Sequence, residues 1–239
     1  MGRGPSIEGR KNAEDSRRAK LFTKLIREIT VAARSGGGDP HANPRLRLGI
    51  DRALAANMTK DTIERAVKRG AGDGGTEHFE EIRYEGYAPG GVALLVDCMT
   101  DNPTRTVAEV RHAFTKLGGH LGTSGSVSYL FERRGEIAID IRSDAGLEDK
   151  AMEAALEAGA DDVVSHADFV EVLTAPEHFE SVKQAVLKAG LVPFRADIAM
   201  RPATTVALEG EAAATVSKLI DWLEDLDDVQ KVFTNADLP

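Results

Sequence analysis

The chain has 239 residues, of which 42% are hydrophobic, and a formal net charge of −9. This length allows two or three domains with real cores. No apolar run approaches the ~18 residues of a membrane span, and no signal peptide is visible. The single cysteine, Cys98, cannot build a disulfide framework. We therefore expect a cytoplasmic protein without a membrane span.

The charge is unevenly distributed along the chain. Residues 1–70 carry 16 Lys and Arg against 8 Asp and Glu, which leaves 14 against 31 for residues 71–239. A basic head of net charge +8 therefore precedes an acidic body of net charge −17. Residues 1–10 contain a Factor Xa recognition sequence, Ile7-Glu8-Gly9-Arg10, and we interpret them as an expression-vector remnant. Residues 11–70 keep 14 basic against 7 acidic side chains, so the asymmetry persists without them.

Three helices are predicted in the basic head, residues 11–75. Residues 12–34 have an apolar stripe at three- and four-residue spacing, and the segment 35–40 ends that helix. Asn43 and Pro44 begin a second helix with a cap followed by proline. Thr59 caps a third helix, and the glycine-dense segment 70–75 reads as a stop and a flexible linker.

The periodicity changes to alternating strands and helices after the linker. Strands are predicted at 79–87, 92–98 and 126–132, with a helix at 104–117. The next segment, residues 134–202, has the order β-α-β-β-α-β, which is typical of a ferredoxin-like domain. A strand at 206–208, a helix at 211–225 and a strand at 229–234 would complete a second such unit with the elements from 92 to 132. We therefore predict an α+β protein with a three-helix head followed by two ferredoxin-like domains. One of these domains (134–202) is inserted in the other (79–133 and 203–239).

The basic side chains of the head are the first candidate site. A solvated helix face would explain the Lys and Arg of one helix, but three successive helices share the excess on an otherwise acidic chain. We therefore predict that the head contacts the phosphates of a nucleic acid. The candidate residues are Lys11, Arg17, Arg18, Lys20, Lys24, Arg27, Arg45, Arg47, Lys60, Arg65, Lys68 and Arg69.

Two loops of the body have features of a phosphate site. The segment 100–106 joins a strand to a helix, where it either caps the helix or holds a phosphate with Arg105 and Arg111. The glycine-rich segment 118–126 lacks the Gly-Lys-Ser/Thr ending of a P-loop and is interpreted as a turn. The strands also lack the aromatic signature of RNA-recognition motifs, so binding is expected to depend on the head and adjoining loops.

Catalytic and metal-binding patterns are missing from the sequence. The six histidines have no metal-ligand spacing, and no serine lies in a nucleophile elbow. We therefore expect a protein that is not an enzyme and needs neither a metal nor a cofactor.

Several longer motifs resemble the YebC family. They are the segments 20–34, 38–40, 43–47, 57–66, 84–92, 107–111 and 122–127, and the resemblance extends over nearly everything after residue 10. It implies a helical head followed by two α+β domains, with no cofactor. Members are described as DNA-binding transcriptional regulators, and others resemble ribosome-associated translation factors. This chain departs from the family at Pro103, where members often carry an extra arginine.

Together these observations predict a non-enzymatic, nucleic-acid-binding regulator of gene expression. DNA and ribosomal or transfer RNA both remain open as its target, the ribosome is a further candidate partner, and a monomer is expected. The alternative is a protein-interaction module whose acidic body docks partners while the head only packs.

Overall fold

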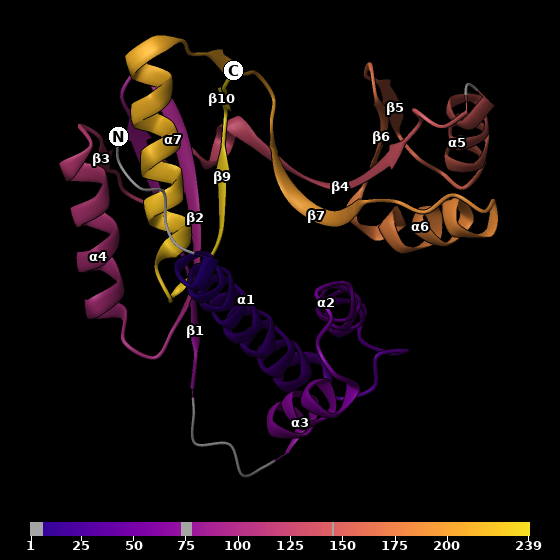
Figure 1. Cartoon of the computed structure of the whole chain (residues 1–239), viewed down its shortest axis with the longest axis horizontal. Helices are drawn as coiled ribbons and strands as arrows, with labels where there is room; N and C mark the ends of the chain where they lie inside the picture. Colours follow the sequence, from indigo (N-terminus) through magenta and orange to yellow (C-terminus); the bar gives the residue numbers. More distant parts are fainter. Residues whose placement is uncertain (1–6, 73–77, 145) are drawn as a thin grey trace. The chain divides into compact units, whose positions relative to one another are not determined.

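The computed structural model describes residues 7–72, 78–144 and 146–239, with side chains from Asp15 onward. Figure 1 labels its helices and strands. The chain forms two compact units, each built from separate segments. The first comprises Met1–Arg83, Val96–Ala113 and Ile220–Val232, and the second comprises Tyr84–Leu95, Phe114–Leu219 and Phe233–Pro239.

The three-helix head is confirmed. Its helices are α1 (Ile7–Gly36), α2 (Pro44–Ala55) and α3 (Lys60–Ala71). Their apolar faces meet in one core cluster, which is fully buried at Ile29 and Leu46. Helix α1 begins five residues before the predicted start, at Ile7.

Asn43 joins the first two helices and caps the second. Its side-chain oxygen accepts a hydrogen bond from Leu46 N (3.1 Å), which satisfies one free amide at the start of α2. Its amide nitrogen donates to Ala32 O (2.8 Å) and Gly37 O (2.9 Å) at the end of α1. The predicted cap is therefore also the residue that fixes how the chain turns between the helices.

Gly70 has a different role from the predicted one. It lies inside α3 and is buried, and a Cβ atom there would lie 2.2 Å from Thr30 O of α1. Glycine is needed because α1 and α3 approach too closely for any side chain. The predicted linker thus begins within a helix, and its residues 73–75 lie outside the described part of the chain.

One four-stranded sheet has the order β3-β1-β2-β9. Its strands are β1 (Glu80–Ala88), β2 (Val92–Thr100), β3 (His120–Leu121) and β9 (Val229–Thr234). Helix α4 (Pro103–Lys116) follows β2 and helix α7 (Gly210–Asp225) precedes β9. A ferredoxin-like order places β8 (Val206–Ala207) beside β2, but β1 takes that position and β8 pairs in parallel with β10 (Ala236–Asp237).

The second four-stranded sheet has the order β5-β6-β4-β7, which is the ferredoxin-like order of a β-α-β-β-α-β chain. All its pairings are antiparallel. Ile137 of β4 pairs with Val172 of β6, and both side chains are fully buried. The elements are β4 (Phe131–Asp140), α5 (Gly146–Glu157), β5 (Asp162–Ser165), β6 (Phe169–Thr174), α6 (Phe179–Lys188) and β7 (Arg195–Pro202).

The α+β fold class is therefore confirmed, and one predicted strand is wrong. Residues 128–130 form a short 3-10 helix, η1 (Ser128–Leu130), and β4 begins only at Phe131. The cause is Glu85, whose carboxylate accepts hydrogen bonds from the backbone of Gly125 (2.6 Å), Val127 (3.0 Å) and Ser128 (2.7 Å). These amides are thus unavailable to a strand. The exact domain boundaries stay a prediction.

Candidate nucleic-acid interface

The cations in the middle of α1 face carboxylates of the same compact unit. We call residues 224–228, from the end of α7 to the start of β9, the acidic turn. Lys20 Nζ lies 2.6 Å from Asp225 Oδ1, and Lys24 Nζ donates to the carbonyl oxygen of Glu224. Arg27 Nη1 donates to Met99 O (2.8 Å) and to Asp228 Oδ1 (3.2 Å). Three of the predicted phosphate ligands therefore have partners within the protein.

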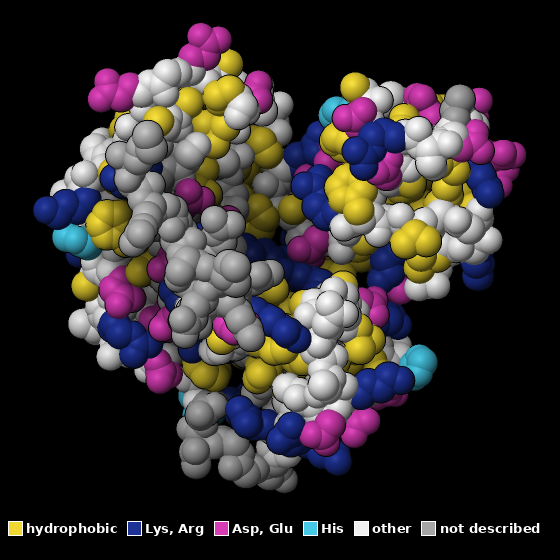
Figure 2. All heavy atoms as spheres, in the orientation of Figure 1, with side chains coloured by type: hydrophobic (Ala, Val, Ile, Leu, Met, Phe, Trp, Pro, Cys, Tyr) yellow, Lys and Arg dark blue, Asp and Glu magenta, His cyan; other side chains and the backbone are white. Residues whose placement is uncertain are grey.

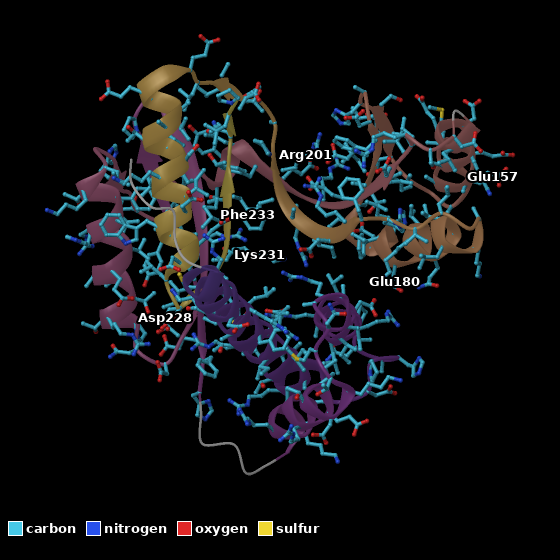
Figure 3. The ribbon with its side chains drawn as sticks, viewed as in Figure 1. Glu157, Glu180, Arg201, Asp228, Lys231 and Phe233 are labelled. Atoms are coloured by element: carbon cyan, nitrogen blue, oxygen red, sulfur yellow. The ribbon has the colours of Figure 1, made fainter. Side chains whose placement is uncertain are left out.

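Asp228 is the most enclosed carboxylate of the acidic turn, with 2% of its side chain exposed (Figure 3). It also accepts hydrogen bonds from Thr106 Oγ1 (2.8 Å) and Arg105 Nη2 (2.9 Å). Burial alone would raise the pKa of Asp228, but these hydrogen bonds and that of Arg27 hold the pKa below its usual range. Asp228 thus stays charged while it joins α1, α4 and β9.

Arg105 is engaged in the same cluster. Its guanidinium contacts Asp228 and also Asp101 Oδ1 (2.8 Å). Its backbone nitrogen donates to Asn102 Oδ1 (3.1 Å) at the start of α4. The structure therefore favours the capping interpretation of this loop over a phosphate site. Arg111 is exposed and makes no hydrogen bond or ion pair within the described residues.

Other predicted ligands have partners in the head or in β1. Arg45 forms ion pairs with Glu28 (2.9 Å) and Glu81 (2.5 Å). Burial alone would lower the pKa of Arg45, but the hydrogen bonds to these two carboxylates raise it above its usual value. Arg18 lies over the ring of Phe22, 5.2 Å from its centroid. The remaining engaged residues are Arg65, which pairs with Asp61 at 2.8 Å, and Arg47, which is half-buried and interacts within the protein.

Helix α3 carries the cations that remain accessible. Lys60, Lys68 and Arg69 are exposed, and no partner for them occurs in the described part of the chain. At 100° per residue Lys68 falls on the side of the helix opposite the buried Ile63 and Ala66, and Lys60 and Arg69 fall on the two flanks between them. Figure 2 shows dark blue Lys and Arg side chains over α2 and α3, with carboxylates among them. Arg17 of α1 is also exposed and unpaired among the described residues, whereas the side chain of Lys11 lies outside them.

The sequence matches two family profiles that together extend over most of the chain. Residues 4–73 match the TACO1/YebC protein N-terminal domain, and residues 79–236 match the TACO1/YebC second and third domain. The chain belongs to the TACO1/YebC family. This confirms the resemblance seen in the sequence motifs. The first match begins inside the segment interpreted as a vector remnant, an interpretation that stays a prediction.

Relatives of similar length carry a regulatory name. A "probable transcriptional regulatory protein" of Xanthomonas campestris pv. campestris (strain B100) is 56% identical over 239 residues, which cover 99% of this chain and 98% of that protein. One from Stenotrophomonas maltophilia (strain K279a) is also 56% identical and covers 100% of this chain and 98% of its own. The crystal structure of a conserved hypothetical protein from Aquifex aeolicus has a TM-score of 0.84 at 50% identity, and the match covers 94% of this chain and 92% of that one.

Other chemistry has little support in the described part of the TACO1/YebC chain. Within residues 7–72, 78–144 and 146–239, no group of three or more His, Cys, Asp or Glu side chains is placed to hold a metal ion. No helix in that part of the chain is long and apolar enough to cross a membrane. Burial raises the pKa of Cys98 to about 12, so this thiol is not a nucleophile at neutral pH.

Proposed function

We propose that this TACO1/YebC protein is a non-enzymatic, nucleic-acid-binding regulator of gene expression in the cytoplasm, acting on transcription or translation without a cofactor. The names of the relatives support a regulatory role. The basic head supports a polyanionic partner, because residues 1–70 carry a net charge of +8 against −17 for residues 71–239.

The exposed cations of α3 are the observation that carries this proposal. Lys60, Lys68 and Arg69 are accessible, whereas the α1 cations Lys20 and Lys24 are held by the acidic turn. Side chains that contact phosphates fix the position of a nucleic acid without reading its sequence. We therefore place the phosphate contacts on α3, and expect affinity that varies little between sequences.

Charge reversal tests this placement. Lys68→Glu with Arg69→Glu removes two contacts, so it should weaken binding to unrelated duplexes by similar factors, on the order of tenfold or more at moderate salt. Fluorescence anisotropy with labelled duplexes measures the effect. The matched control is Lys150→Glu with Lys188→Glu, two exposed lysines on α5 and α6 that change the net charge equally. Equal loss in both variants would indicate a general charge effect and contradict a site on α3.

A protein-interaction module remains the second candidate. Val192 and Phe194, before β7, are 80% and 64% exposed, which is unusual for apolar side chains of this size. Apolar docking changes little with salt, whereas phosphate contacts weaken steeply as salt rises. Capture of a protein partner that persists at high salt and is lost in Phe194→Ala would favour this candidate.

A further inference from the structure

Three rings lie together beside the glycine-rich loop of the second compact unit. The rings of Tyr87 and His120 stack with centroids 5.5 Å apart and planes at 29°. The residues are register partners of β1 and β3. Burial and the neighbouring phenol of Tyr129 raise the pKa of Tyr87. Tyr129 itself is 73% exposed, and we call the three rings, Tyr87, His120 and Tyr129, the ring platform.

The ring platform is built on a fixed loop. Glu85 is 4% exposed, and its carboxylate accepts the three backbone hydrogen bonds that turn residues 125–128 away from a strand. Its backbone oxygen also accepts from Gly122 N (2.8 Å), and Tyr87 Oη donates to Ser126 O (3.0 Å). The 3-10 turn that follows leaves Tyr129 pointing outward while Val127 enters the core. Because the backbone beside this exposed ring is already fixed, a ligand that binds the ring loses little conformational entropy in ordering the loop.

The sequence segment that contains His120 and Tyr129 is basic, although the body as a whole is acidic. Residues 114–134 contain Lys116, Arg133 and Arg134 against a single carboxylate, Glu132. Arg134 is paired with Asp161 and Glu132, but Lys116 and Arg133 are exposed and have no partner in the described ranges. Accessible rings with unpartnered cations four residues before His120 and four residues after Tyr129 fit a ligand that presents flat rings and negative charge, as a nucleic-acid strand does.

We propose that the ring platform binds unpaired bases of single-stranded RNA, which stack on Tyr129 and His120 while Lys116 and Arg133 attract the adjacent phosphates. Bases of a duplex are already stacked and closed to such rings, whereas RNA loops and ends offer free bases. The exposed hydroxyls of Thr123 and Ser124 on the same loop are available to ribose hydroxyls. This site is separate from the phosphate contacts on α3 and uses a loop, a 3-10 turn and an edge strand instead of ring-bearing central strands.

The test uses the full chain with a short unstructured RNA strand and the same strand annealed to its complement. Tyr129→Ala should weaken binding of the single strand about 5- to 100-fold and leave duplex binding unchanged. Tyr129→Phe keeps the ring and should bind the single strand as the parent does. Leu187→Ala, another exposed apolar residue of the same unit, is the control and should change neither affinity.

Three results would overturn the proposal. The first is that Tyr129→Ala binds the single strand with the affinity of the parent. The second is that Tyr129→Phe loses as much single-strand affinity as Tyr129→Ala, and the third is that Tyr129→Ala loses as much duplex affinity as single-strand affinity. Ultraviolet cross-linking of RNA to the unaltered protein gives a check that does not depend on how the variants fold. Cross-links should fall in the segment 120–129, and their absence there counts against the ring platform. The α3 variant Lys68→Glu with Arg69→Glu should weaken the binding of both single-stranded and duplex RNA. A wrong placement of the phosphate contacts on α3 can therefore be distinguished from a wrong proposal for the ring platform.

Discussion

Gly70→Ala should destabilise the head although alanine is the better helix former. Gly70 lies within α3, and an added Cβ would lie 2.2 Å from Thr30 O and 2.8 Å from Ala33 Cβ of α1. The first of these atoms belongs to the backbone, so the two helices must separate to accept the methyl group.

The size of the effect follows from two opposing contributions. Overpacking a closely packed contact costs about 1–3 kcal/mol, and replacing glycine by alanine inside a helix returns up to about 1 kcal/mol. With the full return subtracted, the expected loss in free energy of unfolding is about 0–2 kcal/mol, and it lies toward 2 because the nearest atom belongs to the backbone. Urea unfolding followed by far-ultraviolet circular dichroism measures it directly.

Gly49→Ala is the matched control in α2. A Cβ at Gly49 would meet Ile29 Cγ1 at 3.4 Å, an ordinary van der Waals distance, so this variant should equal or exceed the parent in stability. If Gly70→Ala proves as stable as Gly49→Ala, the close approach of α1 and α3 is not what requires glycine.

Two further predictions concern the acidic turn. The pKa of Asp228 is lowered in the folded protein, so its contribution to stability is complete above the unfolded pKa of about 4 and is lost as the pH falls through the folded pKa. Asp228→Asn should therefore lower the free energy of unfolding at neutral pH and flatten its decline at acid pH, measured by urea unfolding across the pH range; an unchanged acid slope would contradict this. Lys20→Ala with Lys24→Ala should lower the melting temperature slightly because their partners lie in the acidic turn, while duplex affinity remains near that of the parent; a large loss of affinity without loss of stability would show that α1 binds phosphate directly.

The sequence predicted the elements whose signals are local. The helices of the head and the order of the inserted sheet follow from apolar periodicity and caps such as Asn43, because both depend on neighbouring residues. The strand at 126–132 was wrong because Glu85, about forty residues earlier, takes its amides. Gly70 was misjudged because a glycine that ends a helix and one that lets two helices approach look the same in a sequence.

The sequence showed which residues of the candidate site are basic, but not which of them contact carboxylates elsewhere in the chain. The uneven distribution of charge along the sequence identified the head as basic. The ion pair between Lys20 and Asp225 could not be predicted, because these residues are 205 positions apart. The run of carboxylates at 224–228 was visible, but nothing local showed that α1 would pack against it. For the same reason the exposure of Tyr129 appeared only when the expected strand proved to be a turn.

The salt dependence of nucleic-acid affinity tests the central claim most directly. Each phosphate contact contributes about 0.9 to the slope of log affinity against log salt on a DNA duplex, so replacing Lys60, Lys68 and Arg69 together by Gln should reduce the slope by about 2–3. Replacing Lys20 and Lys24 by Ala should leave the slope unchanged. A variant of α3 that keeps both the affinity and the slope of the parent would contradict the account.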